Sequence, residues 1–290
     1  MSATPTTTSQ PSLLAGLIGY GIQGSLTPAM HEQEGAAQGL RYVYRRIDLQ
    51  ALGLGVEALP ELLTAVERTG FNGLNITFPC KQAVIPLLHE LSDDAAALGA
   101  VNTVVLRDGR RIGHNTDASG FAEGFRRGLP DVALDRVVQV GAGGAGSAVA
   151  QAAVKLGARH LTVIDTDPTR AAQVAADVCA RFGAGRATAG TDLAEALATA
   201  DGVINTTPVG MAKFPGTPIP TSLLRPELWV AEIIYFPLET ELLRNARSLG
   251  CRTLTGGGMA VFQAVDAFRL ITGAEPDAER MQRHFAAMVG

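Results

Sequence analysis

The sequence predicts an α/β fold of two domains, the second of which has a Rossmann-type topology. The chain has 290 residues, enough for two domains of roughly 100–200 residues each. Apolar strand patterns alternate with helical patterns along it, which is typical of a mainly parallel sheet. A glycine-rich stretch at 141–146 follows a β-branched strand at 137–140 and opens a helical pattern. That order is the arrangement of a dinucleotide-binding fold.

The first domain is expected at residues 13–125, after a disordered tail at 1–12. An apolar run that Gly19 ends predicts a strand at Leu13–Ile18, and alternation predicts another at 41–49. The remaining predicted elements are strands at 71–77 and 101–106 and helices at 57–69 and 82–98.

The second domain is expected at 126–255, because Gly, Pro and charged residues at 126–136 interrupt the pattern. Its predicted elements are strands at 137–140, 160–165, 202–205 and 229–234 and helices at 145–156, 168–182, 192–199 and 240–249. Residues 256–290 carry two further helical patterns, at 259–272 and 276–288. Because these helices follow the nucleotide-type unit, we expect them to return to the first domain.

Composition excludes several classes of protein. A chain that is 47% hydrophobic and 18% charged has too much apolar material to be disordered. A net charge of −4 gives no electrostatic reason to bind nucleic acid or an anionic membrane. No apolar run approaches the roughly 18–20 residues of a membrane span, and residues 1–12 lack the basic start and apolar core of a signal peptide.

The cysteines and histidines indicate the compartment of the protein and whether it binds a metal. Cys80, Cys179 and Cys251 are odd in number and far apart, which favours a reducing compartment over a disulfide framework. The five histidines are scattered without metal-ligand spacing. We therefore expect a cytoplasmic protein without a metal site.

The stretch at 141–146 satisfies G-x-G-x-x-G, with Gly141, Ala142, Gly143, Gly144, Ala145 and Gly146 in order. Gly141 permits the tight turn, Gly143 lets the backbone approach a pyrophosphate, and Gly146 allows close helix–strand packing. N–H groups at the start of the helix can then hold phosphates. The alternative is a glycine loop that only turns a corner; the strand and helix around it favour the cofactor site.

An acidic residue ends the next predicted strand. Asp165 lies 19 residues after Gly146, where a carboxylate can accept hydrogen bonds from the ribose hydroxyls of NAD and repel the 2′-phosphate of NADP. Asp167 follows, whereas Arg170 lies a turn into the helix. Either aspartate could instead cap helix 168–182; Asp167 suits the cap and Asp165 the ribose. The sequence therefore favours NAD, with NADP as the alternative.

Polar segments gather at the ends of the predicted strands of the first domain. They are 24–28 (GSLTP), 75–81 (NITFPCK), 102–103 (NT) and 115–117 (NTD). Taken singly, each has a structural explanation: Ser25 and Thr27 could cap a helix, Asn75 and Asn115 could make turns, and Lys81 could be an ordinary solvated lysine. Strand-end positions favour a site, because ligands of open α/β sheets bind beyond the carboxyl ends of the strands.

These segments resemble motifs of the shikimate dehydrogenase family, and most of all its NAD-dependent quinate/shikimate dehydrogenase branch. The motifs are S-x-T-P at 25–28, N-x-T-x-P-x-K at 75–81, G-A-V-N-T at 99–103, N-T-D at 115–117, G-A-G-G-A-G at 141–146, N-T-T-P-V-G-M at 205–211, Y-F-P-L-E-T at 235–240, and Met259 with Gln263. They keep the family's order and span Leu13 to Ala287.

The resemblance implies two α/β domains with the active site in the cleft between them. It implies reversible hydride transfer between a nicotinamide cofactor and the C3 hydroxyl of shikimate, giving 3-dehydroshikimate. One branch of the family has S-x-T-P and an acidic residue at the end of the second strand of the nucleotide-binding domain. Members of that branch also oxidise quinate to 3-dehydroquinate, with NAD as the cofactor. The NADP-dependent branch has S-x-S-P, and N-R-T where this chain has Asp165, Thr166 and Asp167.

By the same resemblance, Lys81 and Asp117 match the catalytic pair. Oxidation of an alcohol needs a group that takes the hydroxyl proton as hydride leaves. An ordinary lysine, with a pKa near 10.4, is too weak an acid to be deprotonated at neutral pH without help, and a neighbouring carboxylate opposes its deprotonation further. We therefore interpret the two residues as a coupled dyad.

The remaining site residues are also carried over from the family. Ser25, Thr27 and Tyr235 match the positions that hold the substrate carboxylate, while Asn75, Thr77, Asn102 and Gln263 suit the ring hydroxyls. The methyl group of Thr27 is expected to help admit quinate. The residues expected near the cofactor beyond the glycine loop are Asp165, Arg170, Thr206, Pro208, Met211, Gly256 and Met259. A plain strand-to-loop turn is the alternative for 205–211.

Two departures from the family pattern put the ring substrate in doubt. Glu232 stands where the family usually has Asp, three residues before the tyrosine, and Gly256–Gly258 replaces a more varied stretch. The alternative enzyme is therefore a shikimate dehydrogenase-like protein acting on a different or aminated ring substrate. A non-enzymatic ligand sensor is disfavoured, since Lys81 and Asp117 are both present. The expected partner is a small molecule, and a homodimer is left open.

Overall fold

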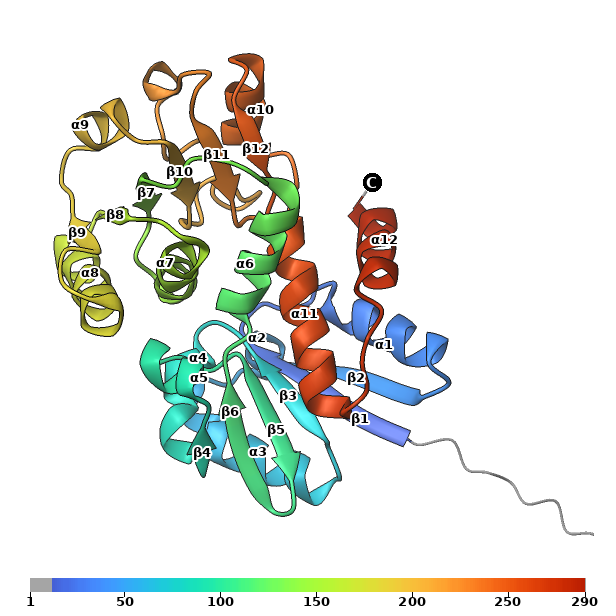
Figure 1. The fold of residues 1–290 in the computed structure, drawn as a ribbon. Helices are drawn as coiled ribbons and strands as arrows, with labels where there is room; N and C mark the ends of the chain where they lie inside the picture. Colours follow the sequence, from blue (N-terminus) through green and yellow to red (C-terminus); the bar gives the residue numbers. More distant parts are fainter. Residues whose placement is uncertain (1–11, 290) are drawn as a thin grey trace, which may run out of the picture.

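The computed structural model describes residues 12–289 as two α/β lobes, each built on a six-stranded sheet, with helices between them (Figure 1). The tail expected at 1–12 falls outside these residues except for Ser12, which already begins a strand. This two-sheet α/β architecture is the fold class that the sequence predicts.

The first sheet has the order β2-β1-β3-β5-β6-β4. Its strands are β1 (Ser12–Gly19), β2 (Arg41–Asp48), β3 (Gly73–Ile76), β4 (Glu90–Leu91), β5 (Thr103–Arg107) and β6 (Arg110–His114). β1 pairs in parallel with β2 and β3, whereas β5 runs antiparallel to both β3 and β6. The start of β5 and the end of β6 therefore lie at the same edge as the end of β3.

Short helices and turns connect these strands. They are α1 (Thr27–Ala37), α2 (Leu49–Leu52), η1 (Val56–Ala58), α3 (Leu59–Arg68), α4 (Cys80–Ala83), η2 (Ile85–Leu87) and α5 (Asp93–Leu98). The single helix predicted at 82–98 is wrong. Pro86 has no N–H to continue a helix, β4 pairs with β6 at 90–91, and Ser92 caps a new helix by accepting the N–H of Ala95 at 3.3 Å.

The second sheet is entirely parallel, with the order β12-β11-β10-β7-β8-β9. Its strands are β7 (Arg136–Val140), β8 (His160–Ile164), β9 (Ala187–Ala189), β10 (Gly202–Asn205), β11 (Trp229–Glu232) and β12 (Arg252–Leu254). The connecting helices are α7 (Gly144–Leu156), α8 (Pro168–Phe182), α9 (Leu193–Ala198), η3 (Thr221–Leu223) and α10 (Glu241–Ser248). The strand order reverses between β7 and β10, and ligands of open α/β sheets bind at such a switch point.

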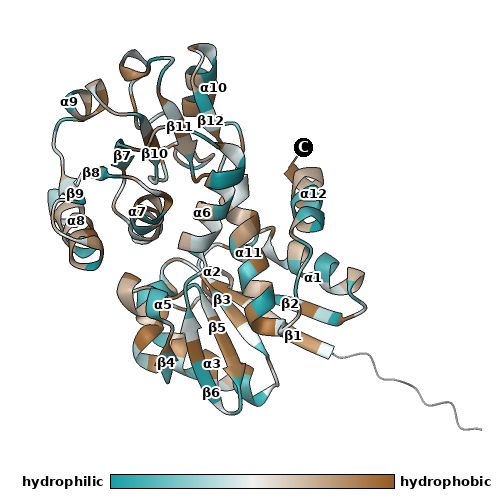
Figure 2. Cartoon of the chain, in the orientation of Figure 1, coloured by the Kyte–Doolittle hydropathy of each residue, from teal (hydrophilic) through white to brown (hydrophobic). Residues whose placement is uncertain are grey.

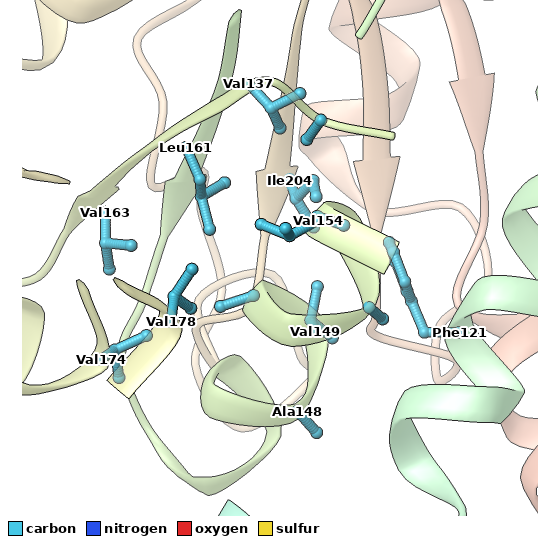
Figure 3. Packing of buried hydrophobic residues seen from close by; sticks show 14 of the residues in the cluster. Phe121, Val137, Ala148, Val149, Val154, Leu161, Val163, Val174, Val178 and Ile204 are labelled. Atoms are coloured by element: carbon cyan, nitrogen blue, oxygen red, sulfur yellow. The ribbon is translucent and has the colours of Figure 1, made fainter. Parts of the chain in front are cut away.

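The core of this lobe forms where α7 packs on β7 and β8 (Figure 3). Val149, Leu161 and Val163 are fully buried there, and burying each such side chain is worth about 1.5–3 kcal/mol. Phe121 reaches this cluster from the helix that leaves the first lobe. Figure 2 shows β1 and β5 of the first sheet mostly brown and the outer helices mixed in colour, as amphipathic layers require.

Two long helices, α6 (Asp117–Gly128) and α11 (Gly257–Thr272), lie side by side between the lobes (Figure 1). Glycines allow their close approach: a Cβ on Gly120 would lie 2.6 Å from the main-chain nitrogen of Gln263. α11 also contacts β3, β5 and α1, and α12 (Ala278–Val289) contacts α1. The sequence patterns did not predict α6, which carries Asp117 at its first residue.

Candidate active site

The polar segments of the first lobe meet at one edge of its sheet. Thr77 and Lys81 follow β3, Asn102 precedes β5, and Asp117 follows β6. Main-chain bonds fix this edge: Ile76 donates its N–H to the Asn102 carbonyl at 2.8 Å, and Asn102 donates to His114 at 3.0 Å. The antiparallel course of β5 is what brings segments from three connections together.

Lys81 and Asp117 form an ion pair at this edge. The Lys81 Nζ lies 2.5 Å from Asp117 Oδ2, with the two side chains 21% and 8% exposed. Lys81 stands on the single-turn helix α4, and its carbonyl accepts the N–H of Val101 at 2.9 Å. The two predicted catalytic side chains are therefore in direct contact, and a charge-assisted bond of this kind is among the stronger ones in proteins.

The other carboxylate oxygen of Asp117 is held by Asn102. Asn102 Nδ2 donates to Asp117 Oδ1 at 2.9 Å, and Asn115 Oδ1 accepts the Asp117 N–H at 3.0 Å. Thr116 donates its N–H to Asn102 Oδ1 at 2.9 Å and its hydroxyl to the Gln263 carbonyl at 3.0 Å. Asn102 therefore contacts the dyad directly, whereas Gln263 reaches this group through its main chain.

Asn75 is enclosed by hydrogen bonds. Its Nδ2 donates to Thr103 Oγ1 at 3.0 Å, and its Oδ1 accepts the hydroxyl of Tyr44 at 2.7 Å. Only 4% of the residue is exposed. Thr77, by contrast, is half-buried at the open end of β3.

Ser25 and Thr27 lie together on the loop from β1 to α1. Both are half-buried, and Ser25 Oγ accepts the N–H of Thr27 at 3.3 Å. Asp48 holds the start of this loop by accepting the N–H groups of Gly21 and Ile22 at 2.9 and 3.1 Å. Burial opposes ionisation of Asp48, but the hydrogen bonds it accepts lower its pKa overall. Arg46 donates to the Ser25 carbonyl at 2.8 Å and so places a cation beside the loop.

The glycine loop lies at the switch point of the second sheet. Gly141 has φ +104°, and a Cβ on Gly146 would lie 2.7 Å from the Gly141 carbonyl oxygen. Beside Gly143 and Gly144 nothing lies within 4 Å of where a Cβ would stand. Open space over a helix N-terminus fits a pyrophosphate. Thr206, buried after β10, closes the floor of the loop by donating its hydroxyl to the carbonyls of residues 140 and 141 at 3.0 and 2.8 Å.

Asp165 and Asp167, the two acidic residues after β8, bind different parts of the second lobe. Asp167 caps α8 by accepting the N–H of Thr169 at 3.0 Å, and it pairs with the exposed Arg170 at 3.3 Å. Asp165 instead accepts the N–H of Ala142 at 2.6 Å from the glycine loop. The cap is the role that the sequence favours for Asp167. The bond from Asp165 to the glycine loop was not expected, and its contact with a ribose stays a prediction.

Buried Glu232 connects two loops beside the cleft. Its carboxylate accepts two contacts from Asn205 Nδ2, at 3.1 and 3.0 Å, and the hydroxyl of Thr240 at 3.2 Å. It also accepts the N–H groups of Ile233 and Ile234 at 2.9 and 3.1 Å. Burial raises the pKa of Glu232 to about 7, although these hydrogen bonds oppose the rise. Glu232 therefore joins the end of β10 to the loop after β11 through its carboxylate.

The remaining predicted residues lie around these loops. Pro208, Met211 and Tyr235 are exposed, and the Tyr235 ring meets Phe285 edge-on at 6.5 Å. Among residues 12–289, Tyr235 shares no hydrogen bond with the other predicted site residues. Gly256 is buried against the carbonyl of residue 233, and Met259 packs on the core of the second lobe.

Sequence reasoning missed three polar residues at the site: Tyr44, Thr103 and Thr116. All three are buried and bonded to predicted site residues. Thr103 and Thr116 belong to the motifs G-A-V-N-T and N-T-D, and their place in these motifs could have identified them as site residues. Tyr44 lies on β2, two strands from β3, and alternation in β2 marked it only as a core residue.

The part of the chain that the structure describes spans residues 12–289. No group of three or more His, Cys, Asp or Glu side chains there could hold a metal ion, and none of its helices is long and apolar enough to cross a bilayer. Cys80, Cys179 and Cys251 are free thiols.

The relatives of this chain make it an NAD(P)-dependent oxidoreductase, in keeping with its Rossmann-type second sheet. Residues 17–104 match the family described as the shikimate dehydrogenase substrate binding domain. Residues 117–225 match the C-terminal domain of alanine dehydrogenase/PNT. The chain belongs to the shikimate dehydrogenase family, as its full-length relatives establish.

Relatives resemble the chain over almost its whole length. A shikimate dehydrogenase (NADP(+)) of Streptomyces avermitilis is 60% identical, over 97% of each chain. A quinate/shikimate dehydrogenase (NAD(+)) of Corynebacterium efficiens is 56% identical, over 96% of this chain and 99% of its own. Among solved structures, quinate dehydrogenase from Corynebacterium glutamicum in complex with NAD superposes with a TM-score of 0.91 at 51% identity, covering 96% of this chain and all of that one.

Proposed function

We propose that this protein catalyses reversible, NAD-dependent oxidation of the C3 hydroxyl of shikimate, and of quinate, with Lys81 and Asp117 as the acid–base dyad. The observation that carries the proposal is the 2.5 Å contact between Lys81 Nζ and Asp117 Oδ2. It is made at the edge of the first sheet where the segments 75–81, 102–103 and 115–117 meet. The names of the relatives support the ring acids as substrates.

In the proposed reaction, the Lys81–Asp117 dyad takes up the proton that the substrate hydroxyl loses. A nicotinamide cofactor held by the glycine loop at 141–146 would supply the acceptor for the hydride that leaves the carbinol carbon. The hydroxyl proton passes to the Lys81–Asp117 pair, whose two members share it as a coupled unit. Because Lys81 is a fifth exposed and Asp117 is nearly buried, the lysine is the member that can reach substrate and then return the proton to solvent.

Residues 13–125 supply the substrate-binding domain in this proposal. The hydroxyls of Ser25 and Thr27, with Tyr235, bind the ring carboxylate. The ring hydroxyls are bound by the residues that the family resemblance assigns to them, which are Asn75, Thr77, Asn102 and Gln263. Residues 126–255 bind the dinucleotide, and the helices of 256–290 return to the first domain.

The preference for NAD rests on Asp165 and Asp167. A carboxylate at the end of β8 accepts hydrogen bonds from ribose hydroxyls and repels a 2′-phosphate. Arg170, a turn into α8, is paired with Asp167 at 3.3 Å. The relatives carry both cofactor names, so cofactor choice is a direct test of this part of the proposal.

The deciding experiment measures initial rates with shikimate and with quinate, each with NAD and with NADP. Strong rates on both acids with NAD alone support the full proposal. Activity with NADP, or on shikimate only, overturns the cofactor or quinate part and keeps the dyad. No activity on either acid favours the alternative of a dehydrogenase for another hydroxylated ring acid.

A further inference from the structure

A continuous chain of buried hydrogen bonds runs from β2 to the dyad. Tyr44 donates its hydroxyl to Asn75 Oδ1 at 2.7 Å, and Asn75 Nδ2 donates to Thr103 Oγ1 at 3.0 Å. Thr103 donates its hydroxyl to Asn102 Oδ1 at 3.0 Å, and Asn102 Nδ2 donates to Asp117 Oδ1 at 2.9 Å. None of the five residues is more than 6% exposed, so water does not compete for these bonds.

Two main-chain groups fix the direction of the chain. The Thr116 N–H donates to Asn102 Oδ1 at 2.9 Å, which identifies the oxygen and the nitrogen of the Asn102 amide in this arrangement. The Asn102 carbonyl accepts from Asn75 Nδ2 at 3.3 Å, which fixes the Asn75 amide likewise. Between these two amides the Thr103 hydroxyl has one arrangement: it accepts from Asn75 and donates to Asn102.

The phenol at the start of the chain is a permanent donor. Asn75 Oδ1 can only accept, so Tyr44 must keep its proton to bond with it. Burial raises the pKa of Tyr44 well above its usual value, which is consistent with a phenol that stays protonated. Chains of aligned hydrogen bonds strengthen one another in a low-dielectric interior.

We propose that Tyr44 and Thr103 are positioning residues that orient the Asn75 and Asn102 amides so that Asp117 Oδ1 always faces an N–H donor. A proton on Oδ1 would oppose that N–H. Proton exchange in the dyad is therefore confined to Asp117 Oδ2 and Lys81 Nζ, the pair 2.5 Å apart. This inference rests on the proposed dyad chemistry and adds two residues to it, neither of which needs to touch substrate.

Tyr42 provides a matched control on the same strand. Its side chain lies on the same face of β2 as that of Tyr44, and its hydroxyl bonds to His31 Nδ1 at 3.1 Å instead of to the chain. Burial lowers the pKa of His31 to about 3, so the imidazole is neutral. Tyr42→Phe and Tyr44→Phe each remove one buried hydroxyl and one hydrogen bond, and they differ in whether the bond leads to Asp117.

The test compares kcat and KM of the full-length wild type, Y42F, Y44F, Thr103→Val and Thr103→Ser. We expect Y44F and T103V to lower kcat about 3- to 10-fold, the worth of one buried hydrogen bond, with the KM for NAD unchanged. Y42F should stay within about twofold of wild type, and T103S should restore kcat because it keeps the hydroxyl. Equal kcat values for Y44F and Y42F, or wild-type kcat for T103V, would overturn the proposal.

A second readout separates this proposal from the proposed function. The side-chain amide protons of Asn102 can be followed by ¹⁵N-edited NMR without turnover. Faster solvent exchange of these protons in Y44F and T103V than in Y42F supports the chain, and equal rates in all three refute it. If wild type oxidises neither acid, the proposed function fails while this comparison still decides the positioning role.

Discussion

The carboxylate of Asp165 at the end of β8 accepts the main-chain N–H of Ala142 in the glycine loop, at 2.6 Å. Its other oxygen accepts the N–H of Asp167 at 2.8 Å. One side chain therefore joins the loop that fits a pyrophosphate to the start of α8. The position of this carboxylate is therefore fixed from two sides, and the proposed function gives it the ribose of NAD.

Replacing Asp165 with Ala should weaken the preference for NAD over NADP by about tenfold, because removal of the charge relieves repulsion of the 2′-phosphate. The ratio of kcat/KM for the two cofactors measures this. Asp135→Ala is the control, since Asp135 precedes β7, at the opposite end of that strand from the glycine loop, and pairs with the exposed Arg159 at 3.2 Å. An unchanged ratio in D165A would remove Asp165 from the ribose role.

Lys81→Ala should lower kcat by about 10²- to 10⁴-fold, the usual contribution of acid–base catalysis. NAD affinity, measured by calorimetry, should stay the same because α4 lies in the other lobe. Lys155→Ala is matched: Lys155 also pairs with an aspartate, Asp94, at 2.8 Å, but on α7. Loss of NAD binding in K81A, or a K155A enzyme as slow as K81A, would contradict the assignment.

Thr27→Ser should lower the quinate-to-shikimate ratio of kcat/KM, by up to about tenfold for one methyl group. The hydroxyl that binds the carboxylate is kept, so activity on shikimate should persist. Thr64→Ser makes the same change on α3, where the Thr64 hydroxyl bonds to the carbonyl of residue 60 at 2.9 Å. A constant ratio in T27S would assign quinate selection to another residue.

Glu232 should make stability depend on pH in an unusual direction. Its pKa of about 7 in the folded protein exceeds the ordinary 4.5, so the folded state binds more protons between these values. The free energy of unfolding should therefore fall as pH rises from about 4.5 to 7, by on the order of 1–3 kcal/mol. Urea unfolding at several pH values measures this fall, which Glu232→Gln should remove.

Glu239→Gln is the control for that series, because Glu239 is an exposed acid on the same loop, paired with Arg247 at 2.6 Å. Its pH dependence of unfolding should match wild type. A fall of equal size in E232Q would assign the effect to other groups.

Arg280→Ala should destabilise the protein by about 3–5 kcal/mol, because it leaves the carboxylate of Glu34 buried without its charged partner. Arg280 donates to Glu34 at 2.7 and 2.8 Å, and the Glu34 side chain has no exposed surface. Arg283→Ala breaks an exposed pair with Glu279 at 3.9 Å and should cost about 0–1 kcal/mol. Equal midpoints of thermal unfolding would show that α12 is held by apolar contacts alone.

The sequence determined most of the second lobe. Strand 202–205 and helix 168–182 lie where the patterns predicted them, because hydrophobic periodicity and a Pro or Asp at the helix start are local signals. The glycine motif and the short motifs around Lys81 and Asp117 were readable for the same reason. Each motif is a short continuous segment, and the residue types in it indicate the chemistry that it performs.

Only the tertiary structure decided how those runs meet. The antiparallel pairing of β5 brings Asn75 opposite Thr103, and the hydroxyl of Tyr44 reaches Asn75 from β2. The helix predicted at 82–98 is interrupted by the short strand β4, because residues 90–91 pair with β6. Glu34 and Arg280, 246 residues apart, meet only when α12 docks on α1. Such contacts depend on strand pairing and helix docking between distant segments, which local periodicity does not encode.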